Sequence, residues 1–246
     1  MDRHTLSSLA HAEHPIGAPV GAVNMARLVR RAKCPPNAAV LDLGCGAGEW
    51  ALCALEEHPS AHAFAVDLSA PALRQAEESA RERLLSDRVS YVHGDVREYE
   101  PPRSCDLVMC VGATHAFGGL MGTLRAVEKH VLPGGAVLVG EGVWERPPEH
   151  AALTALGAEP GDFRDLASTV DAVEEAGWTP VYGHISEPGE WDHYEWSWTG
   201  SLTRWALDHP EHADADAALA AAREHREGWL RGYRGVLGFV CLLLRR

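Results

Sequence analysis

The sequence predicts an α/β fold in which helices cover both faces of one sheet. Two observations predict it. Apolar runs of strand length alternate with helical segments from residue 38 onward, and a glycine-rich turn joins the first run to the first helix. This alternation is typical of βαβ units, which place parallel strands side by side and bury both faces of the sheet. A chain of 246 residues suits one such domain.

The elements of the core follow from the apolar runs and their boundaries. Strands are expected over residues 39–43, 61–66, 89–93, 105–111 and 136–141, and helices over residues 49–58, 71–85 and 120–130. For the helix over 71–85, Ser69 is a suitable N-cap and Pro71 lies in the first turn. An apolar stripe at helical spacing is predicted to face the sheet. Its members are Leu73, Ala76, Ala80 and Leu84.

Helical segments are expected on both sides of this core. Residues 1–37 are predicted to form an N-terminal helical cap, which a pair of prolines ends. After the core, a helix is expected over residues 166–176 and a sixth strand over 179–185. A seventh strand is expected over residues 238–244.

The domain organisation follows from these elements. The chain is predicted to be a single domain over residues 1–246, with a core over 38–142. The acidic, mostly helical segment 187–235 separates the sixth and seventh strands, and we expect it to cover the crevice of the sheet as a lid. The predicted architecture is therefore a Rossmann-like, doubly wound sheet of about seven strands with N-terminal helices and a helical insertion.

Composition and charge exclude several classes of protein. The formal net charge is −13, so no nucleic-acid partner is expected, because neutralising phosphates requires clustered Lys and Arg. The apolar run 236–244 is far shorter than the ~20 residues that span a bilayer, so no membrane association is expected. The N-terminus lacks a signal-peptide core, and the six cysteines lack metal-binding spacing. We therefore expect a cytoplasmic protein without a metal.

The glycine turn, VLDLGCGAGEW over residues 40–50, is the first functional signal. A strand, a glycine turn and a helix N-terminus place free backbone N–H groups against a ligand. The turn lacks the Gly-Lys-Ser/Thr ending of a P-loop, and Gly48 comes one place too early for the dinucleotide fingerprint. Asp42 and Glu49 bring carboxylates close to the site of a pyrophosphate. A ligand with an ammonium group fits these acids better.

The glycine turn is the first of four elements that resemble class I S-adenosylmethionine (SAM)-dependent methyltransferases of the small-molecule type. The resemblance covers roughly residues 38–142. The segments Cys105-Asp-Leu-Val and Leu132-Pro-Gly-Gly are similar to the family's entry to the fourth strand and turn before the fifth. In the family, the glycine turn holds the methionine part of SAM, and acids after the second and third strands bind the ribose and the adenine. The resemblance implies these cofactor-binding residues: Asp42, Gly44, Cys45, Gly46, Gly48, Asp67, Leu68, Asp95, Val96 and Val111.

The loop after the fourth strand contains the first candidate catalytic residue. His115 lies at the carboxyl edge of the sheet, where the crevice of an open α/β sheet is found, and is a candidate general base. Glu141, at the end of the fifth strand, is the second candidate. For each, the alternative is a structural role at a helix start or strand end. The residues predicted to contact the substrate are Thr114, Phe117, Trp144, Trp191 and Tyr194.

The predicted function is the transfer of a methyl group from SAM to a small-molecule acceptor by in-line displacement. A non-catalytic protein that binds SAM or its demethylated product, and a methyltransferase acting on a protein, remain as alternatives. An NAD-type oxidoreductase is disfavoured by the early third glycine. The sequence carries no signal for an oligomeric state.

Overall fold

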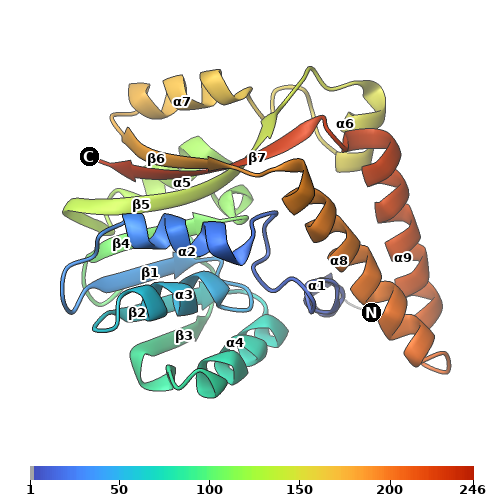
Figure 1. Cartoon of the computed structure of the whole chain (residues 1–246), viewed down its shortest axis with the longest axis horizontal. Coiled ribbons are helices and arrows are strands. Elements are labelled where there is room, and N and C mark those ends of the chain that lie inside the picture. Colours follow the sequence, from blue (N-terminus) through green and yellow to red (C-terminus); the bar gives the residue numbers. More distant parts are fainter. Residues whose placement is uncertain (1–2) are drawn as a thin grey trace.

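The computed structural model describes residues 3–246, so the first two residues of the predicted N-terminal cap lie outside the described residues. Within residues 3–246, seven strands form one mixed sheet in the order β3-β2-β1-β4-β5-β7-β6. Helices pack against both faces of this sheet (Figure 1). The predicted doubly wound α/β fold is confirmed.

The strands lie close to their predicted positions. Their bounds are Ala39–Leu43 (β1), His62–Asp67 (β2), Val89–His93 (β3), Cys105–Val111 (β4), Val131–Trp144 (β5), Thr179–Ile185 (β6) and Leu237–Arg245 (β7). Strand β5 starts earlier than predicted, because Val131 already pairs with Cys105 before the register shifts and Ala136 pairs with Leu107. The first strand is buried at every position and pairs in parallel with both β2 and β4, as expected of a central strand.

The last strand runs against the others. Strand β7 is antiparallel to both β5 and β6, so the sheet is mixed, whereas the βαβ pattern indicated a parallel sheet. The reason lies in the insertion. Helix α8 (Pro188–Asp208) leaves the carboxyl end of β6, and α9 (Ala215–Gly228) returns beside it (Figure 1). The chain therefore re-enters the sheet at the edge that it left, and β7 must run in reverse.

The remaining helices divide between the two faces. Helices α2 (Ala22–Arg31), α3 (Glu49–Glu57) and α4 (Ala70–Glu82) pack on one face, and α5 (Leu120–Val127) and α7 (Leu166–Glu175) pack on the other. Helices α1 (Arg3–Ala10) and α6 (His150–Leu156) lie outside these layers, against the insertion. Short turns complete the chain: η1 (Ser86–Arg88), η2 (Thr114–Phe117) and the π-helical turn η3 (Trp229–Tyr233).

Helix α4 confirms its predicted start and corrects its predicted end. The Ser69 hydroxyl accepts a hydrogen bond from the backbone N–H of Ala72, as expected of an N-cap. The helix ends at Glu82, and Leu84 adopts a left-handed conformation with a φ of 58° and is 90% exposed. The predicted inward position of Leu84 is therefore wrong, and Leu85 is buried instead. The helix therefore ends two residues before Leu84, the last residue of the predicted apolar stripe.

Candidate active site

The glycine turn connects β1 to α3 through three left-handed residues. The φ angles of Gly44, Gly46 and Gly48 are 77°, 52° and 80°. A Cβ atom on Gly44 would lie 2.3 Å from the Cβ of Ala113, so this position has no room for a side chain. The backbone N–H of Gly46 donates to Asp67 Oδ2 at 2.8 Å, which ties the turn to the end of β2. Cys45, in the same turn, is buried.

Asp42 lies beneath this turn and is 2% exposed. Within the described part of the chain, its Oδ2 atom has no hydrogen-bond partner. Burial, followed by the nearby charge of Asp67, raises the pKa of Asp42 to about 7. A buried carboxyl oxygen without a partner is costly, and a ligand ammonium group would satisfy it.

Glu49 does not share this role. Its two carboxylate oxygens accept hydrogen bonds from Arg83 Nη2 at 2.6 and 2.8 Å, so Arg83 balances its charge. From the sequence, the carboxylates of Asp42 and Glu49 together favour a ligand with an ammonium group. Because Arg83 already pairs with Glu49, the expectation of an ammonium ligand depends on Asp42.

Two further acids follow β2 and β3. Asp67 Oδ1 accepts from the backbone N–H of Ser69 at 2.7 Å, and Leu68 beside it is 54% exposed. Asp95 accepts from Arg97 Nε at 3.0 Å, and the hydrogen bonds from the Arg97 side chain and backbone N–H lower the pKa of Asp95 to about 2. Asp95 is therefore ionised at neutral pH.

Two apolar residues of the predicted cofactor set are buried. Val96, next to Asp95, belongs to the core cluster on the α5 face, and Val111 belongs to the cluster on the opposite face. Among the apolar residues predicted to bind the cofactor, Leu68 is the exposed one.

The loop after β4 is held by Glu141. The Glu141 carboxylate accepts hydrogen bonds from the Thr114 side chain and from the backbone N–H groups of Gly142 and Leu120. Burial raises its pKa, and these hydrogen bonds oppose the shift. Since its oxygens bind the chain itself, Glu141 fixes η2 and the start of α5. His115, by contrast, is exposed on η2.

The other substrate candidates on this side of the sheet are packed. Thr114 is buried, and Phe117 is half-buried against the core cluster on the α5 face. Trp144 is buried, its indole N–H donates to the carbonyl of Pro160 at 3.0 Å, and its ring meets Phe163 edge-on. The structure therefore places Trp144 in a packing cluster, and its contact with the substrate stays a prediction.

The N-terminal segment covers the crevice. Trp50 Nε1 in the first turn of α3 donates to the carbonyl of Ile16 at 3.2 Å. A Cβ atom on Gly112, just after β4, would lie 3.0 Å from the carbonyl oxygen of Gly17. Ile16 and Gly17, within the segment 14–17, therefore lie against both α3 and the loop that follows β4. We call this segment the roof.

His14, in the roof, was missed by the sequence reasoning. Its imidazole is buried, contacts the rings of His193 and Tyr194, and has an Nδ1 atom with no hydrogen-bond partner in the part of the chain that is described. Burial lowers the pKa of His14, so its neutral form is favoured. A cluster of histidines ahead of the first strand was the available signal in the sequence.

Helix α8 faces the roof with the predicted aromatic residues. The Tyr194 hydroxyl lies 3.0 Å from His11 Nε2, and Trp191 meets Tyr194 edge-on at a ring distance of 6.2 Å. Burial raises the pKa of Tyr194. Glu190, on the same helix, accepts a hydrogen bond from the backbone N–H of Gly21 at 2.6 Å, just before the start of α2. The N-terminal segment and the insertion are thus joined side by side.

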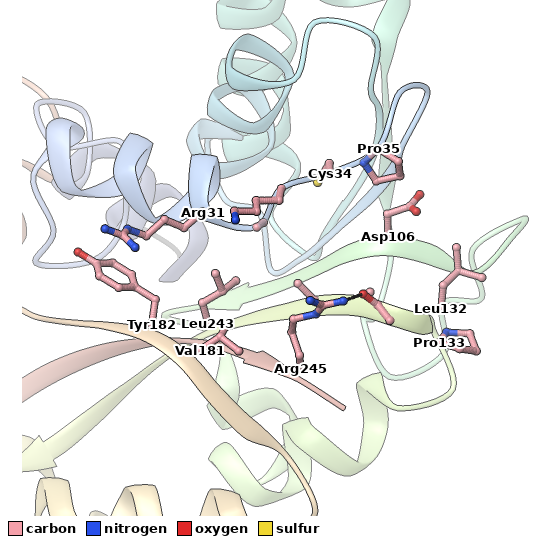
Figure 2. A pocket seen from close by; sticks show the side chains of 15 residues that line it. Arg31, Cys34, Pro35, Asp106, Leu132, Pro133, Val181, Tyr182, Leu243 and Arg245 are labelled. Atoms are coloured by element: carbon pink, nitrogen blue, oxygen red, sulfur yellow. Dashed lines mark hydrogen bonds between the residues drawn. The ribbon is translucent and has the colours of Figure 1, made fainter.

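A cavity of about 380 Å³ lies at the opposite edge of the sheet (Figure 2). It is lined by Asp106 at the start of β4, by Arg31 at the end of α2 and by Arg245 at the end of the antiparallel β7. Arg245 Nη2 donates to the carbonyl of Gly134 at 2.6 Å, and the Arg31 guanidinium lies over the ring of Tyr182. Because ligands of open α/β sheets bind at the carboxyl edge, this cavity is separate from the crevice.

These features define a doubly wound α/β protein whose glycine turn and acidic strand ends face one covered crevice. A family model described as "Methyltransferase domain" matches residues 40–135. The uncharacterized protein YjhP of Escherichia coli (strain K12) is 30% identical over 213 residues, which are 86% of each chain. The chain belongs to the class I SAM-dependent methyltransferase family, and its cofactor is SAM.

Solved structures extend this likeness to the whole chain. A SAM-dependent methyltransferase from Geobacter sulfurreducens, crystallised with S-adenosyl-L-homocysteine (SAH), superposes with a TM-score of 0.91 at 26% identity and covers 99% of this chain and 98% of its own. A SAM-dependent methyltransferase from Thiobacillus denitrificans, also crystallised with SAH, superposes with a TM-score of 0.90 at 27% identity. The match covers 99% of this chain and 98% of that one. The N-terminal segment and the insertion are therefore shared with these relatives.

No helix in residues 3–246 is long and apolar enough to cross a membrane. Among the same residues, no group of three or more His, Cys, Asp or Glu side chains is arranged to hold a metal ion.

Proposed function

We propose that the chain transfers the methyl group of SAM to a small-molecule acceptor. The observation that supports a small acceptor is the roof, because its residues Ile16 and Gly17 contact α3 and the loop after β4. A macromolecular acceptor needs an open approach to the crevice. The net charge of −13 also opposes the binding of a nucleic acid.

We assign the cofactor's methionine part to the glycine turn and its ammonium group to Asp42. Two observations support the fit: the Asp42 Oδ2 atom is unpartnered among the described residues, and the Gly44 position is too close to Ala113 for a side chain. Asp67 lies where it can accept hydrogen bonds from ribose hydroxyls. We assign the amino group of the adenine to Asp95 and its face to the exposed Leu68.

The residues at the crevice then orient the acceptor. SAM supplies an electrophilic methyl group on a sulfonium. Holding the acceptor in line with it accounts for up to ~7–11 kcal/mol of barrier reduction in favourable cases. We assign His115 as the base for a hydroxyl acceptor, since it is exposed on η2 at the carboxyl edge. We assign Glu141 as a positioning residue, because its carboxylate holds Thr114 and the start of α5.

We also place the reaction in the cytoplasm. The six cysteines are free within the described chain, and five of them are buried. Burial raises the pKa of the Cys34 thiol to about 11, so even the cysteine that is not fully buried is weakly reactive. Thiols that persist unpaired are typical of a reducing compartment.

The experiment that tests this proposal is a methyl-transfer assay with an unbiased acceptor pool. The protein is incubated with methyl-labelled SAM and a metabolite extract, and in parallel with protein and RNA fractions. We expect the unchanged protein to label a small molecule of the metabolite extract. The Asp42→Asn variant should leave that extract unlabelled. Label confined to protein or RNA would overturn the small-molecule assignment, and so would SAH formation without a labelled product.

A further inference from the structure

The cavity at the amino edge of the sheet, which we call the amino-edge cavity, carries positive charge in an acidic chain. Its lining contains three cationic side chains, Arg31, Lys33 and Arg245, and one carboxylate, Asp106. The whole chain has a formal net charge of −13. Exposed charges are screened beyond about 8 Å at physiological ionic strength, so a ligand in the cavity meets mainly the local charges. These leave two positive charges in excess.

The three cations have no carboxylate partner among the described residues. The Arg31 guanidinium lies 4.0 Å from the centre of the Tyr182 ring, and Arg245 Nη2 donates to the carbonyl of Gly134 at 2.6 Å. The Lys33 side chain has neither an ion pair nor a hydrogen bond within residues 3–246. The positive charge of the lining is therefore not balanced by the chain.

The arginines next to them in the sequence are paired. Arg30 Nε donates to Glu57 Oε2 of α3 at 2.7 Å, and Arg246 forms an ion pair with Glu128. The chain thus supplies a carboxylate to each neighbour but none to Arg31 and Arg245. Like charges gathered around one cavity repel one another, and an anion bound among them would remove that cost.

Both arginines of the lining keep donor groups for a ligand. A guanidinium has five N–H donors in one plane, and a position above an aromatic ring leaves those at its edge available. Arg31 has this position above Tyr182, and the hydrogen bond from Arg245 to Gly134 uses one donor of five. Figure 2 shows Arg31 and Arg245 on two sides of the cavity, one from α2 and the other from β7. Their planar edges match the oxygens of a phosphate or a carboxylate.

The rest of the lining indicates what else the ligand carries. The volume of about 380 Å³ lies near the lower end of the range for small-molecule sites. Val181 of β6 is 47% exposed and Leu132 of β5 is 38% exposed, so both offer apolar surface to a short carbon chain or a ring. Asp106 Oδ2 accepts from the backbone N–H of Ala39 at 2.9 Å, so the chain itself engages part of the opposing carboxylate.

We propose that the amino-edge cavity binds a small phosphomonoester with an apolar or aromatic part, at a site separate from the crevice. A phosphomonoester carries nearly two negative charges at neutral pH, because its second pKa is about 6. It would therefore balance the two positive charges in excess, whereas a monocarboxylate would balance one. Arg31, Lys33 and Arg245 bind the phosphate oxygens, and Val181 and Leu132 contact the carbon part.

The test uses phenyl phosphate as the probe and compares it with benzoate and with neutral phenol. Binding to SAH-saturated protein, in which the cofactor site is filled, is measured by calorimetric titration in a phosphate-free buffer of low salt. We expect phenyl phosphate to bind, benzoate to bind at least tenfold more weakly, and phenol not to bind at the same concentrations. Because Arg31, Lys33 and Arg245 are exposed, salt should weaken the binding of phenyl phosphate.

Two pairs of neighbouring arginines locate the binding. Arg31→Gln and Arg245→Gln each remove one charge from the lining, and each should weaken the binding of phenyl phosphate about tenfold. Arg30→Gln and Arg246→Gln remove the same charge one residue away, outside the lining, and should bind the probe as the unchanged chain does. Equal SAH affinity in all four variants shows that each is folded.

Four results would each overturn the proposal. The first is the absence of phenyl phosphate binding at low salt, and the second is equal binding of phenyl phosphate and benzoate. The third is unchanged binding in both Arg31→Gln and Arg245→Gln. The fourth is equal weakening in all four variants, which would indicate attraction to the charged surface in general. None of these results bears on methyl transfer, which the labelling of the metabolite extract tests separately.

Discussion

At the scale of single residues, Asp42 shows how a binding site costs stability. Its carboxyl is buried at 2% exposure, and its pKa of about 7 lies well above the value of 3.8 in an unfolded chain. The folded state therefore binds a proton more tightly than the unfolded state. Protonated Asp42 therefore contributes to the stability of the folded state. This contribution is fully present below pH 4 and is lost as the pH rises through 7. A ligand ammonium next to the ionised carboxylate would offset this loss.

The affinity for SAH is therefore expected to depend on pH through Asp42. With a pKa of about 7, the ionised fraction rises about tenfold between pH 6 and pH 8, and affinity should rise by about the same factor. Calorimetric titration at the two pH values measures this. In Asp42→Asn, the residual affinity should be low and independent of pH. An equal affinity of the unchanged chain at both pH values would show that Asp42 does not bind the ammonium.

At the scale of elements, a single carboxylate joins three of them. Glu190 Oε1 accepts from the backbone N–H of Gly21 and from Asn24 Nδ2, at 2.6 and 2.9 Å, beside the start of α2. Its Oε2 accepts from the backbone N–H of Glu187 and contacts His184 Nε2 of β6, both at 2.9 Å. Burial alone would raise the pKa of Glu190, but these hydrogen bonds lower it. Helix α8 and the segment leading to α2 are thus fastened together.

Replacing Glu190 by Gln is expected to loosen the roof. An amide presents one oxygen where the carboxylate presents two, so at least one hydrogen bond is lost, at a cost of about 1–3 kcal/mol. Hydrogen exchange should speed up in residues 11–21, while the strands keep their protection. Glu211→Gln, at an exposed position after α8, is the matched control. Unchanged exchange over residues 11–21 in Glu190→Gln would argue against the fastening.

At the scale of the whole molecule, the crevice collects parts from the entire chain. The glycine turn, the ends of β2 and β4, the N-terminal segment and α8 meet at one edge of the sheet. The SAH-bound relatives superpose over 99% of this chain, so this assembly is common to them. A ligand bound there contacts segments that are distant in sequence, and it should stabilise them as one cooperative unit.

Saturating SAH is accordingly expected to raise the unfolding temperature as a single transition. At a hundred times its dissociation constant, a ligand of the native state adds about 2.7 kcal/mol, which corresponds to about 5–10 °C for a domain of this size. Differential scanning calorimetry measures the shift. Two separate transitions, of which SAH moved one, would show instead that the insertion unfolds independently of the cofactor site.

Much of the fold and the identity of the cofactor could be predicted, because the signals for both are local in sequence. The bounds of β1, β3, β4 and β6 match the predicted ones, since each strand is a run of strand length with a clear break at either end. The predicted end of α4 was wrong. The helix stops before Leu84, which adopts a left-handed backbone conformation, and the apolar spacing of the sequence does not mark this stop. The packing of Trp144 against Phe163 and its hydrogen bond to Pro160 could not be predicted, because no local pattern marks those partners.

The sequence by itself determined the doubly wound core, the glycine turn and the acids at the strand ends, because each depends on residues within one turn or one strand. Tertiary structure alone decided the reversal of β7, the pairing of Glu49 with Arg83, the packing of His14 against His193 and Tyr194 and the hydrogen bond of Trp50 to Ile16. The physical reason is that the partners of a side chain are set by packing between elements far apart in sequence, and neither helical nor strand periodicity encodes them.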